Sequence, residues 1–247
     1  MRSVIVTGAG SGIGRAAALQ FAAAGDWVVV ADVNGDAAMA VVAEIDEAGG
    51  KAVAATGDLA DRAAAEQVVA TAVSTFGGVD VLVNNAGVMD SMSAVADTSD
   101  EMWERVLGVN LTAPFLLTRA ALPHMLAKER GAIVFTASEA GLRGSASGAA
   151  YTASKHGLIG LMRNVAIMYR DKGIRANAIA PGGTRTNISV QADPTTLGPQ
   201  VVGRYLGNAG RIADADEQAA AIVFLASDAA SNINGVVLPV DNGWSAV

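Results

Sequence analysis

A chain of 247 residues, 51% of them hydrophobic, is long enough for one large α/β domain with a substantial core. Its 17 basic and 24 acidic residues give a formal net charge of −7, which lacks the basic footprint of a nucleic-acid-binding protein. The chain contains no cysteine, which excludes disulfides, thiolate catalysis and cysteine-ligated metals.

Strand-like and helix-like segments alternate along the chain. Short apolar segments predict strands at 3–6, 27–31, 51–56, 80–84, 132–137, 174–180 and 236–240. Helical patterns lie between them, at 13–24, 35–48, 60–76, 100–109, 112–128, 151–171 and 214–226. Strands separated by helices form right-handed βαβ units. The sequence therefore predicts a single Rossmann-type α/β domain over residues 1–247, a doubly wound parallel sheet of about seven strands with helices on both faces.

Two features of the chain concern its surroundings and its substrate. The first predicted strand begins almost at Met1, and no apolar run approaches 18 residues. We therefore expect a cytoplasmic protein without a membrane or nucleic-acid partner. The longest stretch without a clear pattern is 187–213, and loops of this length in compact domains are usually lids or binding loops, so we expect a substrate loop there.

The first predicted strand runs into a glycine-rich turn, Thr7-Gly8-Ala9-Gly10-Ser11-Gly12-Ile13-Gly14, which is followed by a strong helix former. Glycines let a backbone approach a pyrophosphate, and a helix N-terminus offers free N–H groups to it. No Gly-Lys-Ser/Thr follows, which argues against a triphosphate-binding P-loop. The pattern predicts a dinucleotide site, and a purely structural strand-to-helix turn is the alternative.

Tyr151 and Lys155 are four residues apart on a predicted helix. At this spacing two side chains share one helix face, with their Cβ atoms about 5–6 Å apart. An ammonium beside a phenol favours the phenolate, so we expect the pKa of Tyr151 to lie below its reference value of about 10. Such a phenol is a candidate general acid or base near neutral pH.

The order of these motifs resembles the short-chain dehydrogenase/reductase family over residue 3 to about residue 243. The turn has the family's spacing Thr-Gly-x-x-x-Gly-x-Gly, and the pair has its spacing Tyr-x-x-x-Lys. Further family landmarks follow in order: Asp58-Leu59, Asn84-Asn85-Ala86-Gly87, Asn110 in Val-Asn-Leu, Ser138 thirteen residues before Tyr151, and the stretch from Pro181 to Thr186.

The resemblance implies an oxidoreductase that transfers a hydride between nicotinamide and a secondary alcohol or ketone. Tyr151 would exchange the proton, Ser138 would hold the substrate oxygen, and Lys155 would stabilise the phenolate and hold the nicotinamide ribose. The backbone carbonyl of Asn110 would link Lys155 to solvent through a water. The implied cofactor-binding residues are Gly8, Ser11, Gly12, Ile13, Gly14, Asp32, Val33, Asp58, Leu59, Asn85, Ala86, Gly87, Tyr151, Lys155, Pro181, Gly182, Thr184 and Thr186.

The cofactor is expected to be NAD rather than NADP. Asp32 ends the second predicted strand, where a Rossmann-type acid accepts hydrogen bonds from the adenosine ribose. Relatives that prefer NADP commonly carry a basic residue at the positions of Ser11 and Val33. Asp32 and Asp58 could instead cap the helices that follow them, and Asn110 could mark a helix kink or cap.

The remaining interpretations concern substrate, partners and rivals. No metal is expected, and we interpret His124 and His156 as structural. The predicted substrate walls are Met89, Met92, Glu139, Arg143, Gly182, Asn187 and Ile188. The apolar helices at 157–169 and 111–126 suggest a homotetramer like those of the family, or at least a dimer.

One alternative function is a 3-oxoacyl-thioester reductase whose carrier protein would bind a basic patch of Lys128, Arg130, Arg170 and Lys172. Another is a cofactor-binding redox sensor without turnover.

Overall fold

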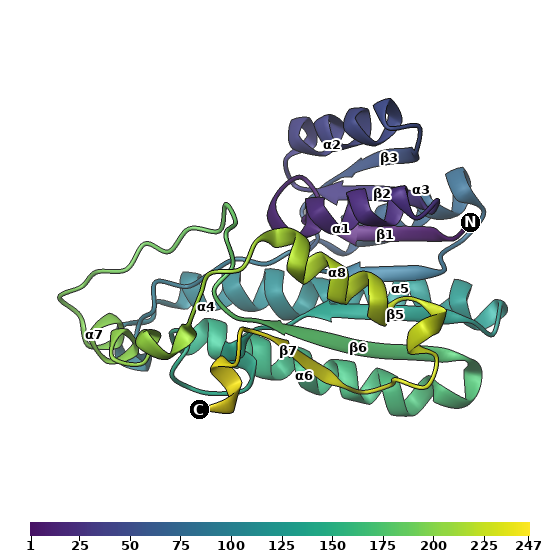
Figure 1. Cartoon of the computed structure of the whole chain (residues 1–247). Helices are drawn as coiled ribbons and strands as arrows, with labels where there is room; N and C mark the ends of the chain where they lie inside the picture. The colour runs from purple at the N-terminus through teal and green to yellow at the C-terminus, as the bar shows by residue number, and fades with distance from the viewer.

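The computed structural model describes the whole chain, residues 1–247, as one parallel sheet between two layers of helices (Figure 1). The sheet has seven strands in the order β3-β2-β1-β4-β5-β6-β7. Their bounds are β1 (Ser3–Thr7), β2 (Trp27–Asp32), β3 (Lys51–Thr56), β4 (Val81–Asn84), β5 (Gly131–Thr136), β6 (Ile174–Pro181) and β7 (Val237–Val240). Strands β1, β4 and β5 are buried at every position and β6 at every position but Arg175, as expected for strands covered on both faces.

The chain reverses its direction of travel across the sheet between β1 and β4. Strands β1 to β3 are added on one side of β1, and β4 then pairs with its other side. In open α/β sheets such a switch point leaves a crevice outside the carboxyl ends of the strands. The fold therefore provides a ligand site where the loops after β1 and β4 diverge.

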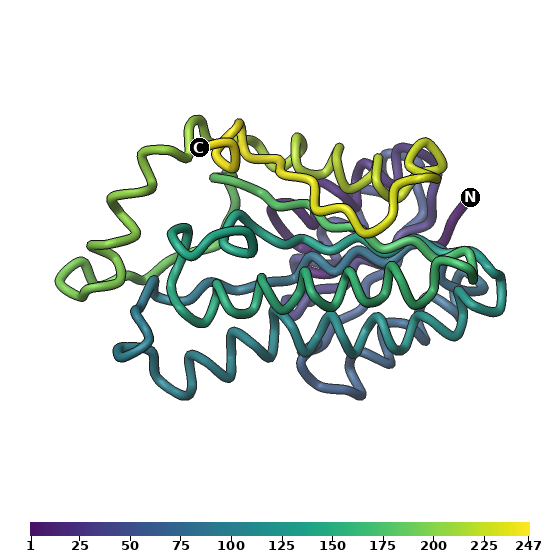
Figure 2. Tube along the Cα trace, turned by 90° about the horizontal axis from the view of Figure 1, so that it is seen from below, coloured from purple at the N-terminus to yellow at the C-terminus, as the bar shows by residue number.

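Helices cover both faces of the sheet (Figure 2). One hydrophobic core includes side chains of α1 (Gly12–Ala23), α2 (Gly35–Glu47) and α8 (Ala215–Leu225). The other includes side chains of α3 (Arg62–Phe76), α5 (Ala113–Ala127) and α6 (Ala149–Tyr169). The predicted fold class and the seven predicted strands are confirmed, with ends that shift by one or two residues.

Two helical segments differ from the sequence prediction. The predicted helices 100–109 and 112–128 are joined, because α4 (Asp100–Leu107) continues through a π-helical turn, Gly108–Thr112, into α5. The segment 187–213 contains a short helix, α7 (Leu197–Gly203), and a 3₁₀ turn, Leu206–Ala209, which the sequence did not predict. This segment projects from the body of the molecule beyond the carboxyl edge of the sheet (Figure 1).

The joined helical run Asp100–Ala127 is long and apolar enough to cross a membrane by length and composition alone. Half of its most apolar window is buried inside the protein, however, where Leu117, Ala121 and Met125 belong to the core. Core helices of soluble proteins commonly share these properties. The run is therefore accounted for as a core element of this fold.

Candidate active site

A cavity of about 840 Å³ lies at the carboxyl edge of the sheet, where the switch point predicts a ligand site. Loops that follow β1 to β6 line it. Most of the residues predicted from the sequence contribute to its walls: Gly8, Ser11, Gly12, Ile13, Asp32, Val33, Asp58, Leu59, Asn85, Ala86, Gly87, Ser138, Tyr151, Lys155, Pro181, Gly182, Thr184 and Thr186. Its volume is within the range of small-molecule and cofactor sites.

The glycine-rich turn forms a cradle that larger residues would fill. Gly8 and Gly12 have φ of 62° and 52°, a region that favours glycine. A Cβ on Gly14 would overlap the carbonyl oxygen of Gly8, so Gly14 permits the packing of α1 on the turn rather than lining the cavity. Ser11 is the N-cap of α1, but its side chain makes no capping hydrogen bond, and Gly12 and Ile13 in the first turn of α1 line the cavity. This arrangement fits an anionic pyrophosphate.

Asp32 ends β2 and binds the glycine-rich turn. Its Oδ2 accepts a hydrogen bond from the N–H of Gly10 at 2.8 Å, and its Oδ1 accepts one from the N–H of Asn34 at 2.9 Å. The N-cap of the following helix α2 is Asn34. The alternative interpretation of Asp32 as the cap of that helix is therefore wrong. Each carboxylate oxygen retains acceptor capacity toward the cavity.

Asp58 likewise is not the cap of the helix after it. The N-cap of α3 is Asp61, whose side chain accepts a hydrogen bond from the N–H of Ala64. Asp58 accepts one from the N–H of Ala60 at 3.0 Å and is otherwise exposed at the cavity wall beside the buried Leu59. Its carboxylate is therefore available to a ligand.

Asn85 links the ends of three strands. Its Nδ2 donates to the carbonyl oxygen of Thr7 at 3.0 Å, and its Oδ1 accepts from the hydroxyl of Thr136 at 3.1 Å. The hydroxyl of Thr7 accepts from the N–H groups of Asn85 and Ala86, at 2.9 and 3.0 Å. These contacts hold β1, β4 and β5 in one register at the cavity floor.

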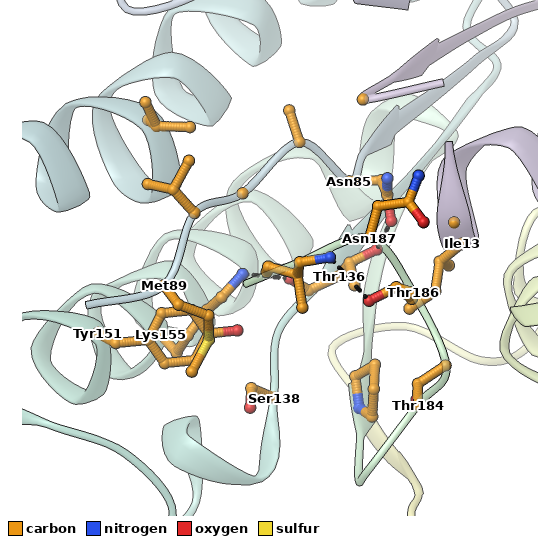
Figure 3. Close-up of a pocket in the computed structure, with 18 of the residues that line it drawn as sticks. Ile13, Asn85, Met89, Thr136, Ser138, Tyr151, Lys155, Thr184, Thr186 and Asn187 are labelled. Atoms are coloured by element: carbon orange, nitrogen blue, oxygen red, sulfur yellow. Dashed lines mark hydrogen bonds between the residues drawn. The ribbon is translucent and has the colours of Figure 1, made fainter. Parts of the chain in front are cut away.

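Tyr151, Lys155 and Ser138 converge on one end of the cavity (Figure 3). The first turns of α6 carry Tyr151 and Lys155, and Ser138 follows the end of β5. Ser138 lines the cavity together with Tyr151, and its Oγ accepts a hydrogen bond from the N–H of Ala140 at 3.1 Å. Lys155 is 3% exposed, and its Nζ donates to the carbonyl oxygen of Thr136 at 2.8 Å. The hydroxyl of the same Thr136 donates to Asn85, so Lys155 is connected to the Asn85 hydrogen bonds.

The pKa of Tyr151 differs from the sequence expectation. Burial and, to a smaller extent, the charge of Asp90 raise the pKa of Tyr151 to about 12, against an opposing effect of the Ser138 hydroxyl. The predicted lowering of the Tyr151 pKa by Lys155 is wrong. Lys155 Nζ donates to Thr136 instead and lies 5.4 Å from the centre of the Tyr151 ring. Burial also lowers the pKa of Lys155 to about 8. At neutral pH these residues therefore present a phenol and a largely charged amine.

Asp90 is a site residue that the sequence reasoning missed. It is 3% exposed, and its Oδ2 accepts a hydrogen bond from the N–H of Tyr151 at 2.9 Å. Its Oδ1 accepts from the N–H of Gly148 at 3.3 Å and from the hydroxyl of Ser147 at 3.2 Å. Gly148 is the N-cap of α6 and has no side chain of its own for capping. Asp90 thus caps α6 from the loop after β4 and fixes the position of Tyr151.

Asn110 lies in the π-helical turn, behind the cavity wall, and is fully buried. Its Nδ2 donates to the carbonyl oxygen of Val88 at 2.9 Å and to the hydroxyl of Ser154 at 3.2 Å, and its Oδ1 accepts from the N–H of Val88 at 2.9 Å. Its side chain therefore connects the loop after β4 to α6. The role of its backbone carbonyl stays a prediction.

Thr184 and Thr186 follow β6 and also line the cavity (Figure 3). The hydroxyl of Thr184 donates to the carbonyl oxygen of Gly182 at 3.2 Å and accepts from Gln218 at 3.2 Å. The side chain of Thr186 lies against Gly12 of the glycine-rich turn. These contacts close the loop after β6 over the N-terminus of α1.

The predicted substrate walls are partly wrong. Met89, Gly182, Asn187 and Ile188 line the cavity, whereas Met92, Glu139 and Arg143 do not. The walls also include residues that were not predicted, among them Arg105, Val109, Ala146, Leu206 and Trp244. Trp244 follows β7 and reaches the cavity only because the C-terminal segment returns to the carboxyl edge of the sheet.

The basic patch considered for a carrier protein lies at the other edge of the sheet. Lys128 and Arg130 precede the start of β5, and Arg170 and Lys172 precede the start of β6. Lys128 and Arg130 are paired with Asp80 and Asp228, at 2.8 Å each. In a parallel sheet these positions are a full strand length from the cavity.

The two histidines do not reach the cavity, and no group of three or more His, Asp or Glu side chains could hold a metal ion. His156 is exposed on α6 and makes a 2.9 Å hydrogen bond through Nδ1 to the carbonyl oxygen of Thr152. The chemistry available at the site is therefore that of hydroxyl groups, an amine and carboxylates, beside a cradle for an anionic dinucleotide.

Comparison with known proteins agrees with this site. A sequence model described as short chain dehydrogenase matches residues 2–196. A 3beta-hydroxysteroid dehydrogenase 2 from Eggerthella lenta is 42% identical over 247 residues, which cover 99% of this chain and 95% of that protein. The chain belongs to the short-chain dehydrogenase/reductase family and is an oxidoreductase of that family.

Solved structures of dehydrogenases and reductases are similar to this chain over its whole length. The crystal structure of levodione reductase has a TM-score of 0.91 and 35% identity, covering 100% of this chain and 98% of the other. A protein described as an NAD(P)-dependent gluconate 5-dehydrogenase from Beutenbergia cavernae, with NADP bound at low occupancy, has a TM-score of 0.88 and 40% identity, covering 100% of this chain and 97% of the other. The relatives named here are dehydrogenases and reductases.

Proposed function

We propose that this protein is an NAD-dependent oxidoreductase that interconverts secondary alcohols and ketones, with Tyr151 as the acid–base residue. The observation that carries the proposal is the convergence of two hydroxyl groups, Ser138 and Tyr151, and the buried amine of Lys155 on one dinucleotide-sized cavity. A redox sensor without turnover would not require this arrangement.

The residues of the chain fit a nicotinamide dinucleotide along the whole cavity. The glycine cradle and the N-terminus of α1 would hold the pyrophosphate, and Asp32 and Asp58 would hold the adenosine half. Lys155 would hold the second ribose, and Thr186 would hold the carboxamide. The bound cofactor supplies a ring that accepts or gives a hydride and that is positively charged in its oxidised form.

In the direction of ketone reduction, Ser138 donates a hydrogen bond to the substrate oxygen and Tyr151 transfers its phenolic proton to that oxygen. The raised pKa of Tyr151 keeps this proton in place at neutral pH. In alcohol oxidation the same oxygen of Tyr151 must first be a phenolate, so this direction requires added positive charge beside the ring. Positioned acid–base catalysis of this kind contributes roughly 10²–10⁴-fold to the rate.

The choice of NAD over NADP rests on the end of β2. Asp32 is an acid at the expected position of the ribose hydroxyls, and Val33 beside it is exposed and uncharged. No basic side chain forms a salt bridge with Asp32. A 2′-phosphate would face this carboxylate, which supports NAD as the cofactor.

The substrate class is proposed from the cavity walls near Ser138. Val88 and Met89 pack beside Tyr151, and Leu206 and Trp244 also line the cavity, so its walls suit a hydrophobic alcohol or ketone. The names of the relatives, a hydroxysteroid dehydrogenase and a levodione reductase, point to the same class. The carrier-dependent thioester reductase has less support, because the basic patch that it would use lies at the far edge of the sheet.

The test is a screen of secondary alcohols and ketones with NAD(H) and NADP(H), followed by the variant Tyr151→Phe. We expect turnover to fall by roughly 10²–10⁴-fold while the affinity for NADH is unchanged, since the ring remains and only the transferable proton is lost. Tyr169→Phe, the same change at the far end of α6, serves as the control. Turnover within a few fold of the parent would remove Tyr151 from the mechanism.

A homotetramer, or at least a dimer, is proposed from α5 and α6. Phe115 on α5 and Ile167 and Met168 on α6 are 44%, 56% and 67% exposed, although both helices also bury apolar faces in the core. Burial of these side chains by a second copy of the chain would remove this apolar surface from water. Light scattering of the parent and of Ile167→Glu would test it. The cytoplasmic location stays a prediction.

A further inference from the structure

Helix α7 is attached to the rest of the protein through one small buried face. Between residues 187 and 212 only Gly198 and Val202 are buried, and they lie four residues apart on one side of α7. The hydrogen bonds of residues 189–210 all lie within that stretch. Packing of this face therefore holds α7, while the segment around it stands away from the body of the molecule (Figure 2).

The face of α7 packs on backbone. A Cβ on Gly198 would overlap the carbonyl oxygen of Met92 and would lie 2.6 Å from the backbone nitrogen of Ala94. Backbone atoms cannot turn aside as the end of a flexible side chain can. Gly198 therefore lets α7 approach the loop Met92–Ala94 more closely than any larger residue would allow.

The same loop holds the first turn of α6 on another side. The carboxylate of Asp90 accepts from the N–H of Tyr151 at 2.9 Å, and the carbonyl oxygen of Ser93 accepts from the N–H of Ala149 at 3.0 Å. A Cβ on Gly148 would lie 2.6 Å from both Asp90 Oδ2 and the backbone nitrogen of Ser93. The loop 90–94 is thus in direct contact with the residues that place Tyr151.

Met92 joins these two contacts. Its φ of 58° lies in the left-handed region that a methionine rarely adopts. Such backbone conformations persist where the surroundings hold them. The N–H of Met92 donates to Asp90 Oδ1 at 2.9 Å, and its carbonyl oxygen lies under Gly198. One residue is therefore held both by the carboxylate that caps α6 and by the face of α7.

The chain on either side of α7 lines the cavity. Asn187, Ile188 and Ser189 come before the helix and Leu206 comes after it, and all four line the same cavity as Tyr151. Whether α7 is seated on the loop therefore affects where these walls lie.

We propose that Gly198 is a positioning residue, and that the loop Asp90–Ala94 couples closure of the segment 187–213 over the substrate to the placement of Tyr151. With α7 seated, Met92 is held and Asp90 keeps its hydrogen bond to the N–H of Tyr151. When α7 lifts, the loop relaxes and the first turn of α6 loosens with it. The proposal deepens the proposed function and rests on it for the identity of this cavity as the substrate site.

Coupling of this kind is reciprocal. A change that frees α7 must loosen the start of α6, and a change at Asp90 that loosens the loop must free α7. A helix that only covered the substrate would show neither effect. The two directions can be measured separately, and neither measurement needs a substrate.

The first measurement follows α7 and uses the absence of cysteine from the chain. Val202→Cys places a single thiol on the buried face of α7, and its rate of reaction with an aromatic disulfide reagent is measured in the full chain. Adding Gly198→Ala should raise this rate at least about tenfold. Gly203→Ala is the matched control, because a Cβ at this end of the same helix meets no atom within 4 Å, and it should leave the rate within about twofold.

The second measurement follows α6 by hydrogen exchange of the peptide 148–152, with Val202 intact. Gly198→Ala should speed this exchange several-fold, and Gly203→Ala should leave it unchanged. In the reverse direction, Asp90→Asn should speed the thiol reaction of Val202→Cys several-fold. Asp97→Asn, an exposed acid of the same connection, should not change it.

An unchanged thiol rate in Gly198→Ala would overturn the role of Gly198. A faster thiol reaction with unchanged exchange at 148–152, or an unchanged thiol rate in Asp90→Asn, would overturn the coupling. Should Gly198→Ala not fold, Val202→Ser disturbs the same face without a backbone clash, and hydrogen exchange at 148–152 and 197–203 decides in the same way.

Kinetics separate coupling from simple covering once the screen has found a substrate. Gly198→Ala should raise KM and lower kcat, each several-fold, with the affinity for NADH unchanged, because Tyr151 is displaced as well as the substrate. A rise in KM alone would refute the coupling. Failure of the whole screen would count against the proposed function alone, since the thiol reaction and the hydrogen exchange do not depend on it.

Discussion

The cofactor preference can be tested through one side chain, Asp32, without disturbing the fold around it. Asp32→Asn removes the negative charge and keeps one oxygen acceptor and the shape of the side chain. One of the two loop hydrogen bonds, from Gly10 at 2.8 Å or from Asn34 at 2.9 Å, can therefore be retained. The variant therefore removes the charge of Asp32 without unfolding the glycine-rich turn, so a change in cofactor preference reports the charge.

The size of the effect follows from charge and hydrogen bonding. Two unit charges 4 Å apart repel by about 4 kcal/mol at an effective dielectric of 20. A ribose hydroxyl that donates to a carboxylate contributes about 1.5–3 kcal/mol, and the 2′-phosphate removes it. The neighbouring Val33 is 72% exposed, so water reaches this part of the cavity and screens the charge. We expect a net preference of roughly 3–4 kcal/mol, or 10²–10³-fold, for NAD(H).

The assay is the fluorescence of NADH and NADPH titrated with protein, which requires no knowledge of the substrate. The parent should bind NADH roughly 10²–10³-fold more tightly than NADPH. In Asp32→Asn only a neutral hydrogen bond of about 0.5–1.5 kcal/mol remains, so the ratio should fall to about tenfold or less. Asp58→Asn, another acid at the cavity wall, should leave the ratio unchanged. Tighter binding of NADPH by the parent, or an unchanged ratio in Asp32→Asn, would refute this reasoning.

Four further outcomes are expected. Lys155→Met should lower both turnover and NADH affinity, and unchanged affinity in binding titrations would contradict its contact with the ribose. With the pKa of Tyr151 raised to about 12, ketone reduction should be fastest at low to neutral pH and alcohol oxidation should accelerate as pH rises; coincident profiles, with the chemical step rate-limiting, would count against the phenol. Asp90→Asn leaves buried N–H donors unpaired and should cost about 2–3 kcal/mol, a drop in Tm of about 4–12 °C by calorimetry, and an unchanged Tm would show that Asp90 does not cap α6. Gly14→Ala places a Cβ on the carbonyl oxygen of Gly8, so NADH binding should be lost or the protein should not fold, and normal binding would show that the turn can shift.

The fold could be predicted because its signals are local. Each strand is a short apolar run and each covering helix has its own pattern, so β1 to β7 were recognised without knowledge of their neighbours. The segment that forms α7 contains Gly198, Pro199 and Gly203, which weaken any helical pattern. Gly198 lies against the backbone of Met92 and Ala94, so this short helix depends on tertiary packing that the sequence does not display.

The site residues that belong to a sequence motif could be predicted. Those that reach the site through tertiary packing could not. Tyr151, Lys155 and Ser138 have fixed spacings, whereas Asp90 and Trp244 approach them from segments distant in sequence. Only the folded chain brings a carboxylate to the uncapped start of α6 or a tryptophan from beyond β7 to the cavity. The pKa of Tyr151 could not be predicted from its spacing to Lys155, because the direction of the amine is set by Thr136.

The π-helical turn at Gly108–Thr112 has a consequence for how this protein can change length during evolution. A π turn holds one residue more than an α turn, and it lies inside the otherwise continuous run Asp100–Ala127. Because the wider turn takes up the extra residue, deletion of one residue there would restore a regular α-helix and leave α4 and α5 facing nearly the same way. The wide turn that directs the buried Asn110 at the backbone of Val88 would be lost, however. We therefore expect natural insertions and deletions to accumulate in 187–213 and to avoid 100–127.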